Sequence, residues 1–144
     1  MRLANGSVAG SRCVLALLAV LVGGLFHAEV HAGATTFTVT NQGLGAYVID
    51  GQANAPLQLT RGETYTFNLN APGHPFLLKT VQGNGVGNQY TSGVTGNGTQ
   101  TGTLTFSVPL DAPNTLFYNC EFHFSMTGTI TVVNGDPIFG DGFE

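Results

Sequence analysis

Charged residues are scarce in this sequence of 144 residues. Lys, Arg, Asp and Glu together make up 8% of it, about a third of the roughly 25% found in ordinary soluble domains. The formal net charge at pH 7 is −4, which argues against a nucleic-acid partner. Hydrophobic residues make up 42%, enough for a core, so the chain is not of the disordered class. The length fits one domain.

Long apolar runs are absent, with one exception near the N-terminus. Residues 14–26 read VLALLAVLVGGLF, a run shorter than the roughly 20 residues that a membrane-spanning helix needs. Arg2 and Arg12 precede it, and Val30-His31-Ala32 and Ala32-Gly33-Ala34 follow it, either of which fits the cleavage site of a secretory signal. We predict a signal peptide over residues 1–34 and an exported chain, periplasmic or extracellular, with no membrane span after cleavage. A retained membrane anchor is the alternative.

Cysteine and histidine are also rare. Beyond the predicted signal the chain holds Cys120, His74, His123 and Met126 as its only cysteine, histidines and methionine. One thiol excludes an internal disulfide, and a lone cysteine in an oxidising compartment is a liability unless it is buried or bound. Two histidines are too few for a multicopper oxidase, and no G-x-S-x-G or P-loop pattern is present. We therefore predict that the protein is not an enzyme.

Helical periodicity is absent after residue 34, and alternation with a period of two takes its place. This alternation predicts seven or eight short strands and an all-β, antiparallel Greek-key sandwich over residues 35–133. Residues 81–100 are rich in Gly, Asn and Thr and predict a long mobile surface loop. Residues 134–144 predict an acidic, flexible tail. The expected strands are 37–41, 46–49, 57–59, 64–69, 76–79, 101–108, 116–120 and 128–133.

The stretch FYNCEFHFSM at residues 117–126 carries the chemistry. Its pattern C-x2-H-x2-M places Cys120, His123 and Met126 on a tight turn after a predicted strand, so thiolate, imidazole and thioether can face one centre. His74, just after Pro72–Gly73, is the only other imidazole left. Two histidines and a cysteine with a weak axial methionine are the ligands of a blue copper site.

This pattern resembles that of the cupredoxins, the small blue copper proteins that include plastocyanin and amicyanin. The specific part is Tyr118-x-Cys120-x-x-His123-x-x-Met126-x-Gly128, and the resemblance extends over roughly residues 35–133. It implies a Greek-key sandwich that holds one type 1 copper per chain near one end. It also implies His74, Cys120 and His123 as strong ligands, Met126 as axial ligand, and a role in carrying single electrons.

Two features leave alternatives open. Many cupredoxins have Asn or Ser directly after the first ligand histidine, where it ties the ligand loops together, but this chain has Pro75. Contacts of this kind tune a metal and hold its ligands, so the reduction potential stays open. Glu121 is an alternative to Met126 as a ligand, disfavoured because neighbouring residues at a strand end point to opposite sides.

The expected function is that of an exported, monomeric electron carrier. We expect redox protein partners to dock near His123, on an apolar rim formed by Phe122 and Phe124, because weak redox encounters use small patches. Pro75 and Phe76 also flank the ligand histidines, and for all four flanking residues core or rim packing is the alternative. A copper-delivery module without an electron-transfer role and a metal-free cupredoxin-like scaffold are the alternative functions.

Overall fold

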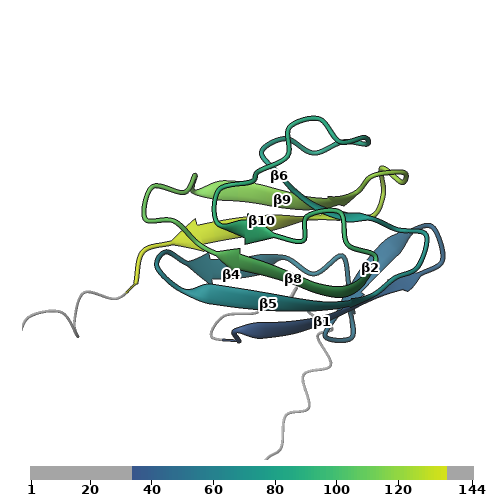
Figure 1. Ribbon diagram of the computed structural model, residues 1–144. Helices are drawn as coiled ribbons and strands as arrows, with labels where there is room; N and C mark the ends of the chain where they lie inside the picture. Colours follow the sequence, from purple (N-terminus) through teal and green to yellow (C-terminus); the bar gives the residue numbers. More distant parts are fainter. Residues whose placement is uncertain (1–33, 136–144) are drawn as a thin grey trace, which may run out of the picture.

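The computed structural model describes residues 34–135, which form two packed β-sheets (Figure 1). All but the last residue of the predicted signal peptide and most of the predicted tail lie outside these residues. One sheet has the strand order β3-β2-β1-β5-β8-β7, with bounds β1 Thr36–Gln42, β2 Ala46–Ile49, β3 Gln52–Ala53, β5 Thr64–Asn70, β7 Val94–Thr95 and β8 Thr101–Ser107. The other has the order β4-β10-β9-β6, with bounds β4 Leu57–Thr60, β6 Phe76–Lys79, β9 Thr115–Cys120 and β10 Thr127–Val133.

The all-β sandwich is confirmed, and every expected strand is present. The two additional strands, β3 and β7, have two residues each, too few to show alternation. The prediction of purely antiparallel pairing is wrong in two places, because β1 pairs with β5 and β10 pairs with β4 in parallel. A parallel pair needs a crossover connection. Here the chain passes through β4 in the opposite sheet before it returns to β5 beside β1. No helix able to cross a bilayer occurs among residues 34–135.

Aromatic side chains join the two sheets beneath the ends of β6 and β9. The Phe76 and Tyr118 rings are stacked with centroids 5.2 Å apart, and Tyr47 from the other sheet meets Phe76 edge-on at 4.9 Å. All three residues are fully buried. Because aromatic pairs in these arrangements add about 0.5–1.5 kcal/mol each beyond their buried area, they fix the two strands whose ends carry the chemistry.

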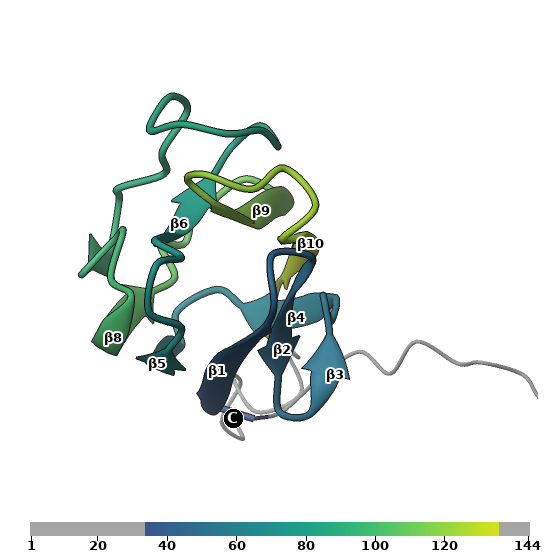
Figure 2. The ribbon, with the colours of Figure 1, turned by 90° about the vertical axis from the view of Figure 1, so that its right-hand side faces the viewer.

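Residues 81–100 lie on the surface, as their composition suggested, and none of them is buried; their mobility stays a prediction. They contain β7 and cover the outer edge of β6, and Figure 2 shows them rising beyond that strand. The main-chain N–H groups of Gly98 and Tyr90 donate to the carbonyls of Phe76 and Leu78, each at 2.8 Å. The Asn97 amide oxygen accepts from Leu78 N–H at 2.8 Å. The segment thus pairs with main-chain N–H and carbonyl groups at the edge of β6. An uncovered edge strand would leave such groups open to pairing with another chain.

Both basic residues of the described chain bind main-chain oxygens. Arg61, in the turn before β5, donates to the carbonyls of Ala112 and Val132 and to the side-chain oxygens of Asn114 and Asn134. Its guanidinium thereby joins the turn that precedes β9 to the end of β10. Hydrogen bonds from a charged donor contribute about 1.5–3 kcal/mol each, so Arg61 stabilises this end of the sandwich.

Lys79 is 1% exposed, and its ammonium organises residues 83–85. Its Nζ donates to the carbonyls of Gly83 and Gly85, the latter at 3.0 Å. We expect Lys79→Met to lower the free energy of unfolding by roughly 1.5–3 kcal/mol, because it leaves these carbonyls without their charged donor. Denaturant unfolding measures this loss. Amide hydrogen exchange should quicken at Gly83 and Gly85, and unchanged exchange there would refute the organising role.

Candidate metal centre

A tight turn places His74 directly in front of β6. The residue before it, Gly73, has a φ of 84°, a left-handed conformation that glycine adopts without steric cost. The turn closes with a hydrogen bond from His74 N–H to the Ala71 carbonyl at 3.0 Å. The sequence Pro72–Gly73 therefore turns the chain so that the His74 ring is buried at the end of the sandwich.

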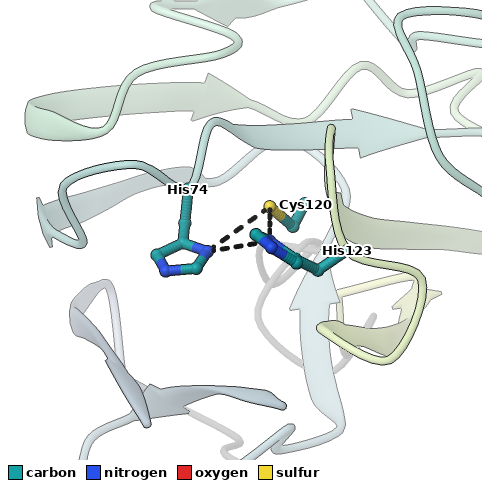
Figure 3. A group of neighbouring side chains, drawn as sticks. All are labelled: His74, Cys120 and His123. Atoms are coloured by element: carbon teal, nitrogen blue, oxygen red, sulfur yellow. Dashed lines mark hydrogen bonds between the residues drawn. The ribbon is translucent and has the colours of Figure 1, made fainter. Parts of the chain in front are cut away.

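The loop after β9 folds back toward the last residue of that strand. Cys120 N–H donates to the Met126 carbonyl at 2.9 Å, and Met126 N–H donates to the His123 carbonyl at 3.2 Å. These two bonds close the loop around the fully buried Cys120 sulfur. His123, in the middle of the loop, is half-buried and points its ring at the same centre as His74 (Figure 3).

Three of the four predicted ligand residues thus meet in one triangle. The Nδ1 atoms of His74 and His123 are 3.1 Å apart, and Cys120 Sγ lies 3.7 Å from His74 Nδ1 and 3.5 Å from His123 Nδ1 (Figure 3). The point equidistant from these three atoms is about 2.0 Å from each, close to the typical metal–nitrogen distance of about 2.0–2.1 Å and metal–sulfur distance of about 2.3 Å. The three residues are therefore placed to bind a metal ion.

Met126 is fully buried and tied into the same loop by its main chain. Its assignment as the axial ligand stays a prediction. Glu121, the alternative ligand, is half-buried. Within residues 34–135, only His74, Cys120 and His123 form a cluster of histidine, cysteine and carboxylate groups that could hold a metal. The carboxylate of Glu121 does not belong to that cluster.

The surroundings of His74 favour its neutral form. Burial, and secondarily the neighbouring His123, lower the pKa of His74. The direction is the one expected when desolvation penalises an imidazolium. Because a metal binds only the deprotonated nitrogen, this environment keeps the His74 lone pair available at pH values where an exposed histidine would already be partly protonated.

The four flanking residues separate into two groups. Pro75 and Phe76 are buried, so the packing alternative holds for them. Phe122 and Phe124 are 56% and 68% exposed on either side of His123. The apolar rim is therefore made by the loop between β9 and β10 alone. The turn after β1 lies beside this rim, because the Leu44 carbonyl in that turn accepts a hydrogen bond from Ser125 Oγ at 3.3 Å.

Two contacts hold His74 and Pro75 that the sequence did not reveal. Tyr47 Oη, from the opposite sheet, donates to the His74 carbonyl at 2.9 Å. Burial, and secondarily the Cys120 charge, raises the pKa of Tyr47 well above its usual range, so the hydroxyl keeps its proton as a donor. Glu121 N–H donates to the Pro75 carbonyl at 3.1 Å. The main chain thus links the two ligand segments, although Pro75 lacks a polar side chain.

The donor set fits copper. Two imidazole nitrogens and one thiolate in a trigonal arrangement, with a buried methionine in the same loop, match the ligand types of a type 1 copper site. Structural zinc sites instead take four strong ligands in a tetrahedron. Among residues 34–135 the cluster has three members, and no carboxylate, further histidine or further cysteine joins it as a fourth.

Comparison with solved structures shows that the fold is cupredoxin-like. Reduced rusticyanin in solution matches with a TM-score of 0.53 and 16% identity, over 72% of this chain and 80% of that protein. A methionine-to-leucine rusticyanin variant matches at 0.51 and 17%, over 72% and 80%. Crystalline reduced rusticyanin matches at 0.50 and 18%, over 72% and 83%. A scan against protein-family models finds no match, and no curated protein matches in sequence.

Proposed function

We propose that this chain is an exported type 1 copper protein that carries single electrons between redox partners. The observation that carries the proposal is the triangle of His74 Nδ1, His123 Nδ1 and Cys120 Sγ, whose dimensions suit a trigonal metal. When bound there, copper supplies a Cu(II)/Cu(I) couple. Rusticyanin, which shares the fold, is described as a copper protein, and its reduced form has been solved.

The residues of the chain suit electron transfer without proton transfer. Cys120 offers a soft thiolate, and both histidines offer neutral nitrogens, which serve both copper oxidation states. His74 and Cys120 are buried and exclude water from one side of the site. His123 is half-buried, so we assign the exit of the electron to its exposed edge. No acid or base needs to change its proton during this cycle.

The decisive experiment adds Cu(II) to residues 35–144 and records absorption, paramagnetic resonance and voltammetry. We expect an intense visible band, a narrow copper hyperfine splitting and a reversible one-electron wave. A delivery module would instead bind Cu(I), release it readily and show no reversible wave. A metal-free scaffold would show no band and no change in melting temperature with copper. Either of these results refutes the electron-carrier proposal.

The exposed rim predicts where partners dock. Phe122 and Phe124 lie beside His123, and Leu44, 66% exposed, lies on the adjoining turn. We expect Phe124→Asp to slow electron self-exchange between two copies of the protein by about tenfold, because the costly contacts of an interface lie near its centre and a loss of about 1.4 kcal/mol there is a tenfold change. Nuclear magnetic resonance line broadening in mixtures of the oxidised and reduced protein measures this rate.

The matched control for this prediction is Leu110→Asp. Leu110 is 80% exposed and lies between β8 and β9, at the start of β9, whereas the rim follows the end of that strand. Leu110→Asp therefore introduces the same negative charge as Phe124→Asp, but at the opposite end of the sandwich. Equal slowing by both variants would show a general charge effect and would remove the support for docking at the rim.

A further inference from the structure

Asn119 is a fully buried polar residue that directly precedes Cys120. Its Nδ2 lies 3.1 Å from the Cys120 carbonyl and 3.4 Å from the carbonyls of both His123 and Met126. The two N–H hydrogens of one amide are thus shared among the main-chain oxygens of three predicted ligand residues. No other side chain contacts all three of these residues through the hydrogen bonds of residues 34–135.

The other atom of the same amide binds the segment that covers this end of the sheet. Asn119 Oδ1 accepts from Gly83 N–H at 2.8 Å. The covering segment makes two more bonds to the ligand loop, from Gly85 N–H to the Glu121 carbonyl at 2.7 Å and from Asn84 Nδ2 to the Phe122 carbonyl at 2.9 Å. Asn119 therefore stands between the ligand loop and residues 83–85.

The strand geometry explains why this position is available. Side chains alternate between the two faces of a strand, so Tyr118 and Cys120 share the core face, and Asn119 takes the outer face of β9. Residues 83–85 cover that face, so the amide is enclosed. A buried amide is costly unless its donors and acceptor are paired, and every buried polar side-chain atom of the described residues has a partner.

We propose that Asn119 is the positioning residue of the metal centre, which holds the carbonyls of Cys120, His123 and Met126 at fixed spacing. The proposal rests on the copper site proposed above. The amide makes the polar contact around the ligand loop that the side chain of Pro75 cannot make. Asparagine suits this role because one side chain supplies both two donors and an acceptor.

Two substitutions separate the donor and acceptor roles of this amide. Asn119→Asp keeps an acceptor for Gly83 N–H but removes the donors to the three carbonyls, and Asn119→Leu removes both. We expect each to weaken copper binding by about 10–100-fold, the usual effect of losing a contact that orients metal ligands. We also expect a wider copper hyperfine splitting and a shifted visible band. Chelator competition, paramagnetic resonance and absorption measure these changes.

The matched control is Asn97→Asp. Asn97 also binds main-chain groups through its amide, on Leu78 and Tyr90, but it contacts no residue of the ligand loop. We expect it to lower the melting temperature and to leave copper affinity and spectrum unchanged. If Asn119→Leu does not fold, Asn119→Ser replaces it in the experiment as the milder substitution. The metal-free protein offers a separate readout, because a loosened loop should expose the Cys120 thiol to faster alkylation in Asn119 variants only.

The outcomes distinguish a failure of the Asn119 inference from a failure of the copper site itself. If the unaltered protein binds copper and the Asn119 variants match it in affinity, spectrum and thiol reactivity while melting earlier, Asn119 is a structural residue and this inference is wrong. If the unaltered protein binds no copper, the copper site fails, and the role of Asn119 fails with it. Weakened binding in both Asn119 variants beside an unaffected Asn97→Asp supports the inference.

Discussion

Replacing Cys120 with serine is expected to remove the visible band of the copper-loaded protein completely. The band depends on charge transfer from a thiolate to Cu(II), and a serine hydroxyl is a hard donor that keeps its proton near neutral pH. We expect copper affinity to fall by more than about 100-fold, beyond the usual loss from an outer contact, because His74 and His123 would then be the only strong ligands. A copper titration followed by absorption tests both effects.

Met126→Leu provides the contrast to this loss. The two side chains have similar volumes, so the buried site should tolerate the change at a cost below about 1.5 kcal/mol. Because an axial thioether binds weakly and mainly adjusts the potential, we expect the band to persist and the potential to shift. A colourless Met126→Leu beside a coloured Cys120→Ser would reverse the proposed ranking of the ligands.

Gly128→Ala is expected to destabilise the fold by about 3 kcal/mol, from overpacking and from displacement of a hydrogen-bonded ring. Gly128 pairs with Tyr118 across β9 and β10. A Cβ at residue 128 would lie 2.3 Å from Tyr118 Oη and 2.5 Å from its Cζ. The ring has no free space to move into, because it is fully buried and its hydroxyl donates to the Ala55 carbonyl at 2.9 Å. Denaturant unfolding of the metal-free protein gives the value.

Gly135→Ala is the matched control, because its Cβ would meet only Thr60 Cγ2 at an ordinary 3.6 Å. We expect a change within about 0.5 kcal/mol there. Tyr118→Leu should partly rescue Gly128→Ala, so that the double variant loses less stability than the two single losses combined. Additive losses would show that the ring and the glycine do not contact each other as described.

The sequence was informative where a pattern repeats or a residue type is rare. Alternation located strands such as β1, β5 and β8 because each has one face in the core, whereas β6 is buried along its whole length and has no alternation. The metal centre was visible because one cysteine and two histidines remain after the predicted signal, which leaves few ways to assemble a site. The pair Tyr118 and Gly128, noticed only as part of a motif, has a packing reason: the ring occupies the space above the glycine.

The sequence was uninformative where side chains replace main-chain partners. Residues 81–100 have little apolar content, yet Asn97 binds Leu78 through its amide and helps to order the edge of β6. Asn119 and Tyr47 lie in strands, and nothing local indicates that Asn119 also binds Gly83 or that Tyr47 binds the His74 carbonyl, both far away in the sequence. The two parallel strand pairs were not predicted for a similar reason: the direction of a strand depends on where the chain crosses between the sheets, which no local pattern shows.

The binding of Lys79 and Arg61 by other parts of the chain has a consequence for proteolysis. They are the only lysine and arginine between residue 34 and the C-terminus, so they are the only places where trypsin can cut the domain. Lys79 is buried in β6, and the half-buried Arg61 is bound through its guanidinium to the turn before β9 and to the end of β10. Trypsin must bind the basic side chain, so cleavage at Lys79 requires β6 to open and cleavage at Arg61 requires its guanidinium to leave these partners. Digestion then follows the population of opened molecules when opening and closing are fast. Loss of intact chain thereby reports opening at these two residues rather than the flexibility of other surface loops.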